Sequence, residues 1–231
     1  MNARQIPFTW AAGAVMTALI AGAALRGALA DPPKPDSTSP TEGPPSVGVV
    51  RTSSPGPKRW LDGVPSGFSH DEDGAQAAAV TFSSLAGSLV NANPASVDSI
   101  VSAISTKASA AQRVAATVAA LDALRSRLAG GTGPIVLVQA PVLIRTDDYS
   151  DAKASITMWT TTVVARRGVA DPQSTWSTIT LELLWERGDW RLDQETTLSG
   201  PTPDQSTDAA PPSFDAFEAA LHGSRPVGSA R

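Results

Sequence analysis

The sequence contains no cysteine, one tyrosine and only two histidines among its 231 residues. The absence of cysteine excludes disulfides, zinc sites with thiolate ligands and cysteine nucleophiles. A strong charge of one sign is also lacking, because 18 Lys and Arg stand against 22 Asp and Glu. This balance does not indicate nucleic-acid binding. With 42% hydrophobic residues, the chain is long enough for one ordinary domain with tails, and short for two.

A long uncharged apolar run lies near the N-terminus, where residues 9–25 contain no charge. At a rise of about 1.5 Å per residue, this run and its neighbours just span a hydrocarbon core of roughly 30 Å. Residues 1–30 are therefore predicted to be a single-pass membrane anchor, with the C-terminal domain outside the cytoplasm. The alternative is a signal peptide, because Ala28-Leu29-Ala30 fits a cleavage site. The length of the run and the charge of Arg26 favour the uncleaved anchor.

Composition divides the remaining chain into three parts. Residues 31–59 are rich in Pro, Ser, Thr and Gly, so they cannot bury enough surface to offset their ordering entropy and are predicted to be a stalk. Residues 60–200 are predicted to be one α+β extracytoplasmic domain, which begins near Trp60 with an ordered loop. Residues 201–231 return to Pro, Ser and Asp and are predicted to be a disordered tail, with 214–223 as the sole candidate for a short helix.

Helical spacing of apolar residues predicts three helices in the first half of this domain. They cover residues 71–90, 95–105 and 108–129. The first is stopped by Asn93-Pro94 and the third by Gly130-Gly131, because these residue types end helices. Three basic residues lie off the apolar stripe of the third helix and are predicted to form a solvated face: Arg113, Arg125 and Arg127.

Four segments rich in Val, Ile, Thr and Trp follow and are predicted to be strands. They are residues 135–146, 154–167, 175–187 and 189–198. Their connectors are short and turn-like, which predicts an antiparallel meander. In the third strand Ile179, Leu181 and Leu183 alternate with polar residues, so one face is expected to pack on helices. The predicted fold class is α+β, with three helices packed on a curved four-stranded antiparallel sheet.

An acidic cluster beside a histidine raises the question of a metal or acid/base site. His70 precedes Asp71, Glu72 and Asp73. Consecutive residues on a helix point about 100° apart, so these carboxylates cannot converge on one ion. A helix start explains them better, with Ser69 as N-cap and the acidic residues in a first turn where the dipole favours negative charge. The small residues that follow would then pack closely beneath the sheet.

The remaining candidates for chemistry also favour structural interpretations. The three aspartates of the first strand connector, Asp147, Asp148 and Asp151, are interpreted as a solvated turn rather than a Ca²⁺ loop. Arg166-Arg167 is interpreted as an exposed strand end rather than a lipid or partner contact. Tyr149 is placed in a turn. Two carboxyls remain as candidate buried bases, Glu182 and Glu195, although alternation puts Glu182 opposite the apolar face. No catalytic, cofactor-binding or metal-binding residue is predicted.

The order of anchor, Pro-rich stalk, three helices and four-strand meander resembles that of actinobacterial bitopic membrane proteins with a nuclear transport factor 2-like (cystatin-like) extracytoplasmic domain. Two segments carry a narrower resemblance to a family of such proteins associated with mobile elements. GVPSGFSHDEDGAQAAA (63–79) resembles its entry motif, G-[FYW]-x-H/R-x-x-x-GA-x-AA. LLWERGDWRLDQETTLSGPTP (183–203) resembles the C-terminal motif of that family, W-x-x-GDW-x-[LV]-D followed by GPTP.

The resemblance implies the function of the scaffold subunit of conjugation and type IV secretion machines, which has no catalytic residues and works through self-association and contacts with other channel components. We therefore expect a non-catalytic, membrane-anchored scaffold of an envelope complex. Its expected partners are other envelope proteins, further copies of itself and the membrane, without direct contact to nucleic acid. The alternative is a small-ligand-binding or enzymatic domain that uses the pocket between helices and sheet.

Overall fold

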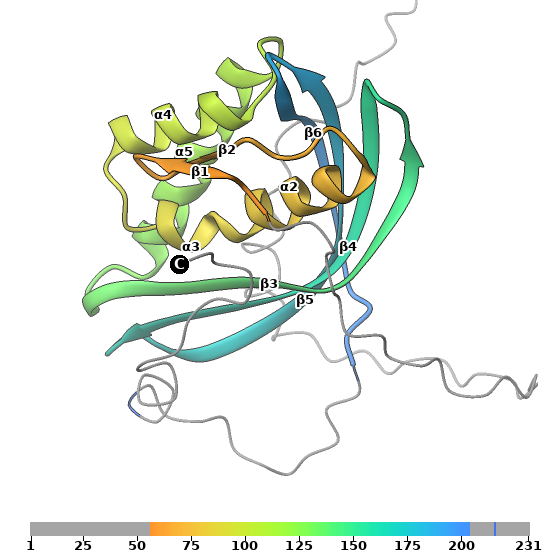
Figure 1. Ribbon diagram of the computed structural model, residues 1–231. Coiled ribbons are helices and arrows are strands. Elements are labelled where there is room, and N and C mark those ends of the chain that lie inside the picture. Colours follow the sequence, from red (N-terminus) through yellow and green to blue (C-terminus); the bar gives the residue numbers. More distant parts are fainter. Residues whose placement is uncertain (1–55, 204–214, 216–231) are drawn as a thin grey trace, which may run out of the picture.

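The computed structural model describes residues 56–203 and Asp215 (Figure 1). These residues form an α+β domain whose helices lie on one side of a four-stranded antiparallel sheet, which confirms the predicted class. The sheet curves around helix α2 (Glu72–Ser84), which crosses its concave face (Figure 1). The predicted anchor (1–30) and most of the stalk lie outside the described residues. Within the described residues, no helix is long and apolar enough to cross a membrane.

The domain begins with a hairpin of β1 (Arg59–Leu61) and β2 (Val64–Ser66), where the sequence predicted an ordered loop. The two residues between these strands, Asp62 and Gly63, have φ angles of 50° and 82°. Positive φ at both central residues is typical of the tight turns that match strand twist. An Asp-Gly pair between two short segments was therefore a hairpin signal.

The last two of the four helices match the prediction within two residues. After α2 come α3 (Ala86–Leu89), α4 (Pro94–Ile104) and α5 (Ala110–Arg127). The predicted first helix (71–90) is divided into α2 and α3 at Leu85. The stop before α4 is confirmed, because the Asn93 side chain accepts a hydrogen bond from the backbone N–H of Ser96 and Pro94 occupies the first turn.

The sheet is the predicted meander, with strand order β3-β4-β5-β6. The strands are β3 (Thr132–Tyr149), β4 (Lys153–Arg167), β5 (Ala170–Glu186) and β6 (Asp189–Ser199). They are longer than predicted, and the connector expected at 147–151 shrinks to 150–152. Asp148 and Tyr149 pair with Ser155 and Ala154 of β4, so ladder pairing overrides the weak strand propensity of aspartate.

The core fills the space between the helices and the concave face. The small residues of α2 that were predicted to pack closely are all buried: Gly74, Ala75, Ala77, Ala78 and Ala79. Leu181 and Leu183 of β5 are at most 1% exposed, which confirms the alternation predicted for this strand. Large apolar side chains from the neighbouring strands, including Ile156 and Met158, complete this layer. The concave face is the inner face of the sheet, and the opposite one is called the outer face.

Candidate functional site

The two segments that carry the family resemblance meet in space, although they are more than a hundred residues apart. Asp189, which opens β6, is 4% exposed. Its carboxylate accepts hydrogen bonds from the backbone N–H groups of Gly67 (2.8 Å) and Phe68 (3.1 Å), just before α2. It also accepts from the backbone N–H of Trp190 (3.1 Å). One buried carboxylate therefore joins the β2–α2 connection to the β5–β6 hairpin.

Aromatic rings complete this junction. Trp190 is fully buried, and its Nε1 donates a hydrogen bond to the carbonyl of Ser69 (3.0 Å). The ring of His70 stacks on Trp185 with 3.8 Å between centroids, and its Nε2 donates to the carbonyl of Asp151 (2.5 Å). His70, which had raised the question of an active site, therefore packs in an aromatic cluster with Trp185 and Trp190.

The acidic cluster is a helix start, as predicted, but its N-cap is Asp71 rather than Ser69. Asp71 has an extended backbone (φ −150°, ψ 176°), and its carboxylate accepts from the backbone N–H of Gly74 at 2.7 Å. The Ser69 hydroxyl supports it by donating to the same carboxylate oxygen (2.8 Å). Glu72 and Asp73 lie in the first turn. Among residues 56–203, no three His, Asp or Glu side chains are grouped so that they could hold a metal ion.

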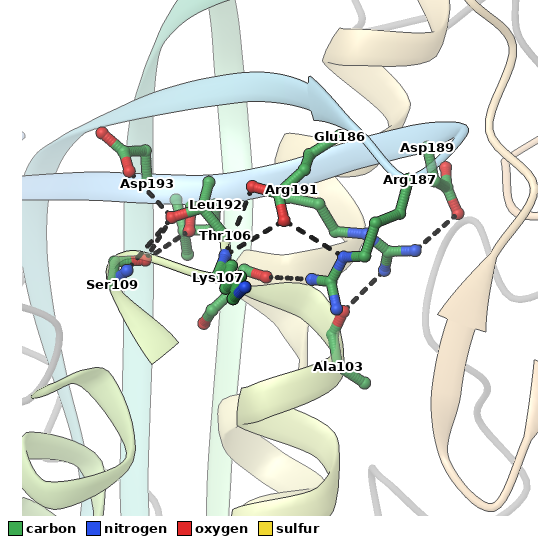
Figure 2. A network of polar contacts seen from close by, with 11 residues as sticks. Ala103, Thr106, Lys107, Ser109, Glu186, Arg187, Asp189, Arg191, Leu192 and Asp193 are labelled. Carbon is green, nitrogen blue, oxygen red and sulfur yellow. Dashed lines mark hydrogen bonds and ion pairs between the residues drawn. The ribbon is translucent and has the colours of Figure 1, made fainter. Parts of the chain in front are cut away.

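A second polar network fastens the α4–α5 connection to the β5–β6 hairpin (Figure 2). Arg187 and Arg191 donate to carbonyls at the C-terminal end of α4, those of Ser105 (2.8 Å) and Ala103 (2.6 Å). Cations at this end of a helix are favoured by the helix dipole. In the same network Glu186 accepts from the backbone N–H of Lys107 (3.1 and 3.2 Å). Sequence reasoning missed these residues, although the charged run 186–191 was the available signal.

Two arginines predicted to be solvated are engaged in the structure, so that prediction was wrong for them. Arg125 donates to the carbonyls of Leu89, Val90 and Ala92 at 2.8 to 3.3 Å, and so closes the C-terminal end of α3. Arg113 pairs with Glu195 at 3.3 Å. Helical periodicity places both off the apolar stripe, and only the neighbouring elements show what they contact.

Glu195 is the one candidate base that the structure buries. It lies on the inner face of β6 opposite Leu181, and its side chain is 4% exposed. Burial raises the pKa of Glu195 to about 7, and the Arg113 guanidinium opposes that shift. The charged carboxylate is disfavoured here because water is excluded, while a single arginine hydrogen bond compensates only in part.

Because Glu195 is buried, we expect the free energy of unfolding of the domain to fall as the pH rises. An unfolded glutamate ionises near its ordinary pKa of about 4.3, whereas the folded one does so near 7. Between these values the folded state binds more protons, so roughly 3 to 4 kcal/mol is lost from pH 4.3 to above pH 7. Chemical denaturation at several pH values should show this loss, and Glu195→Gln should remove most of it. Glu182→Gln, on the outer face, should retain it; an unchanged slope in Glu195→Gln would contradict the assignment.

The other predicted residues lie in ordinary structural roles. Glu182 faces away from the core, as predicted, where it accepts from the Ser155 hydroxyl (2.7 Å) and pairs with Lys153 (2.8 Å). Tyr149 does not lie in a turn but ends β3, where burial raises the pKa of its hydroxyl. Arg166 is not simply exposed, because it donates to the carbonyl of Leu128 (2.7 Å).

The three aspartates of the expected connector do not lie in one turn. Asp147 belongs to β3 and accepts from the hydroxyl of Thr157 (2.6 Å) and from Arg145 (2.5 Å). The Thr157 hydrogen bond, followed by the Arg145 contact, lowers the pKa of Asp147. Asp148 is also in β3, and only Asp151 remains in the connector. The prediction of one solvated turn is corrected accordingly, because the strand extends through the first two positions.

The outer face carries apolar side chains that none of the described helices, α2 to α5, covers. One cross-strand row runs through all four strands, where Leu143 pairs with Trp159, Trp159 with Thr178, and Thr178 with Leu198. Two of these residues are well exposed, Leu198 at 64% and Leu143 at 39%. Alternation along β4 requires this arrangement, because Met158 and Thr160 on either side of Trp159 are buried on the inner face.

An aromatic pair lies at the centre of this face. Trp159 stacks on Trp176 with 4.4 Å between ring centroids and 30° between planes. Val138 of β3 adds a further exposed apolar side chain. These residues are together called the outer apolar surface: Val138, Leu143, Trp159, Trp176 and Leu198. The alternation in the third strand predicted that one face packs on helices, but it did not identify this apolar surface on the opposite face.

Comparison with known proteins gives one family match. The family described as "Domain of unknown function (DUF8175)" matches residues 13–211. No curated protein is similar enough in sequence to be matched. Among solved structures, the intermembrane space region of the chloroplast protein ARC6 is similar at 12% identity and a TM-score of 0.35, over 55% of this chain and 92% of that one.

Proposed function

We propose that this chain, which belongs to the DUF8175 family of domains of unknown function, is a non-catalytic, membrane-anchored scaffold subunit of an envelope complex. Its outer apolar surface is the contact site for an envelope protein or for a second copy. More specifically, we propose that the domain is nuclear transport factor 2-like (cystatin-like) and that it serves a conjugative transfer or secretion apparatus. The uncharged run 9–25 would hold the domain at the membrane.

The outer apolar surface is the observation that carries this proposal. Exposed Leu198, Leu143 and Val138 flank the stacked pair of Trp159 and Trp176. Contiguous exposed apolar patches mark interaction sites, and tryptophan is enriched among the residues that dominate binding energy. A sheet face offers this surface without any rearrangement of the fold.

The edge strand β3 is a less suitable contact site. It contains Pro134 and Pro141, and its pairing with β4 has three register shifts. Proline and bulges are devices that protect sheet edges against pairing with another chain. The face of the sheet is therefore preferred over the β3 edge in this proposal.

The structural engagement of the acidic cluster supports a non-catalytic role. Asp71 caps α2, His70 stacks on Trp185, and Asp189 is occupied by three backbone N–H groups. Side chains committed to such contacts are poorly placed to exchange protons with a substrate. The segments of the resemblance thus hold the fold together.

The test is photo-crosslinking in membranes of the native host, with the crosslinking residue placed at Leu143 or, as a matched control, at Leu61. Both are exposed leucines, but Leu61 lies on β1, away from the sheet face. We expect discrete adducts with an envelope protein or a second copy from position 143, and their loss with Leu198→Ser in the same row. Recovery of the protein as an uncrosslinked monomer from both positions would contradict the scaffold.

The second candidate is a small-ligand-binding domain, favoured by two hydroxyls of the inner face. Thr160 is fully buried, and its Oγ1 has no hydrogen-bond partner among the described residues. The Oγ1 of Thr197, on the same face of the sheet, is also buried without a hydrogen-bond partner among the described residues. A polar ligand between helices and sheet would satisfy both. Stabilisation of the purified protein by a small molecule, lost with Thr160→Val, would favour this function over the scaffold.

A further inference from the structure

We propose that the C-terminal segment, residues 204–231, folds back on the outer face of the sheet and covers the end of that face between Trp159 and Arg167. The amphipathic part at 214–223 makes the contact. The domain thus carries its own occupant for part of the outer apolar surface, which a partner would have to displace. This inference does not depend on the proposed function, because the contact lies within one chain.

The point where the segment leaves the domain lies on the outer face. After β6, the Gly200 carbonyl accepts from the hydroxyl of Thr178 (3.0 Å), and the Gly200 N–H donates to the carbonyl of Trp176 (2.8 Å). The next carbonyl, that of Pro201, accepts from Nε1 of Trp159 (2.9 Å). Two of these three hydrogen bonds come from side chains of the outer face, so Gly200 and Pro201 lie at the outer apolar surface where the described chain ends.

The second attachment point is an ion pair at the far end of β4. Asp215, which is in helical conformation, pairs with Arg167. From Trp159 to Arg167, β4 advances by about 26 Å at roughly 3.3 Å per residue. The chain from Pro201 to Asp215 can reach about 46 Å when extended, at the same rise. Its length is ample to run along the strand between the two attachment points.

The sequence of the segment fits an apolar surface. Phe214, Phe217 and Leu221 follow each other at steps of three and four, a spacing that would put them on one side of the short helix predicted at 214–223. A helix of this length is not stable alone in water, so it needs a surface to form on. The stretch of β4 before Arg167 offers one, because Val163 pairs with Val138 on the outer face.

One residue of the outer face is fully buried at that end of β4. Ala165 alternates with the inner-face residue Val164 and pairs with Val136 of β3. It has no exposed surface, although it does not belong to the hydrophobic core beneath the helices. Ala165 lies two positions before Arg167, which pairs with Asp215. Its burial outside the core is expected if a segment of the chain covers this end of the outer face.

The absence of cysteine from the chain permits a direct test. Val163→Cys places a single thiol under the proposed contact in the full-length, purified protein, and its rate of reaction with a maleimide is measured. We expect the reaction to be about tenfold slower than in the same protein carrying Phe217→Ser and Leu221→Ser, a factor that corresponds to about 1.4 kcal/mol of docking. Leu61→Cys, on β1, is the matched control and should react at the same rate with and without these changes.

The ion pair is tested by charge reversal in the same assay. Arg167→Glu should accelerate labelling of the thiol introduced by Val163→Cys, and the further change Asp215→Arg should restore protection. Equal rates in the wild-type background and in the Phe217→Ser, Leu221→Ser background would overturn the proposal. Protection that weakens on dilution would also overturn it, because a second copy would then be the occupant. The purified protein contains no envelope partner, so failure of the scaffold proposal leaves this outcome unaffected.

Discussion

Replacement of Asp189 by alanine is expected to destabilise the domain by about 3 to 5 kcal/mol. The carboxylate accepts hydrogen bonds from the backbone N–H groups of Gly67, Phe68 and Trp190, and it is almost fully buried. Each donor left without a partner in the interior costs about 1–3 kcal/mol. The change would also detach the β2–α2 connection from the β5–β6 hairpin, so the loss should exceed that of any single surface hydrogen bond.

Guanidinium denaturation followed by tryptophan fluorescence measures this effect, because Trp190 is buried at the junction. Asp171→Ala is the matched control: Asp171 lies exposed near the start of β5, and its loss should change stability by no more than about 0.5 kcal/mol. Asp189→Asn should lie between the two, since its amide oxygen retains part of the acceptor capacity. A loss below about 1 kcal/mol in Asp189→Ala would show that the junction does not depend on the carboxylate.

Gly74→Ala is expected to cost about 3 kcal/mol or more, although alanine is the better helix former. A Cβ atom at Gly74 would lie 2.0 Å from the carbonyl oxygen of Ser69 and 2.7 Å from its hydroxyl. The carbonyl is backbone, and it is also the acceptor for the indole of Trp190, so it cannot move without loss of that hydrogen bond. Overpacking of this kind costs typically 1–3 kcal/mol and occasionally more.

Gly130→Ala is the matched control for this change. At Gly130, φ is +86° and nothing lies within 4 Å of the added Cβ, so only backbone strain of roughly 1–2 kcal/mol is expected. Thermal or chemical unfolding of both variants separates the steric term from the conformational one. Similar losses in the two variants would mean that the loop before α2 yields to the added methyl group, contrary to the close approach seen here.

Both changes fall in the segments that carry the family resemblance, and both are expected to act on stability. Gly74 permits the chain to pass close to Ser69, and Asp189 and Trp190 hold that same connection from the other side. These motif residues are therefore constrained by the junction itself. Our functional proposal therefore rests on the outer face of the sheet, which the junction does not use.

Much of the fold followed from local pattern. The helical spacing up to Gly130 and the alternation of Ile179, Leu181 and Leu183 depend on side chains that must face one core, and short connectors allow only antiparallel neighbours. Boundaries were less well predicted where pairing decides them. Asp147 and Asp148 read as a turn, but β4 continues beside them and supplies partners for the backbone.

The roles of individual polar side chains did not follow from local pattern. Arg113 and Arg125 lie off the apolar stripe of α5 and would be solvated on an isolated helix, yet their partners are Glu195 of β6 and carbonyls after α3. The sequence named Glu195 and Glu182 alike as candidate buried bases, and it could not distinguish them fully because the raised pKa of Glu195 depends on burial by distant elements.

The sequence by itself determined the helical and strand regions of the domain, the order of its four strands and the helix start at the acidic cluster, because each depends on residues within one or two turns or strands. Only the tertiary structure decided that the cluster is a junction with Asp189 and Trp190, and that Leu143, Trp159 and Leu198 line one face. The reason is physical: a hydrogen bond or an apolar row between residues far apart in the chain depends on register and packing, which local periodicity does not encode.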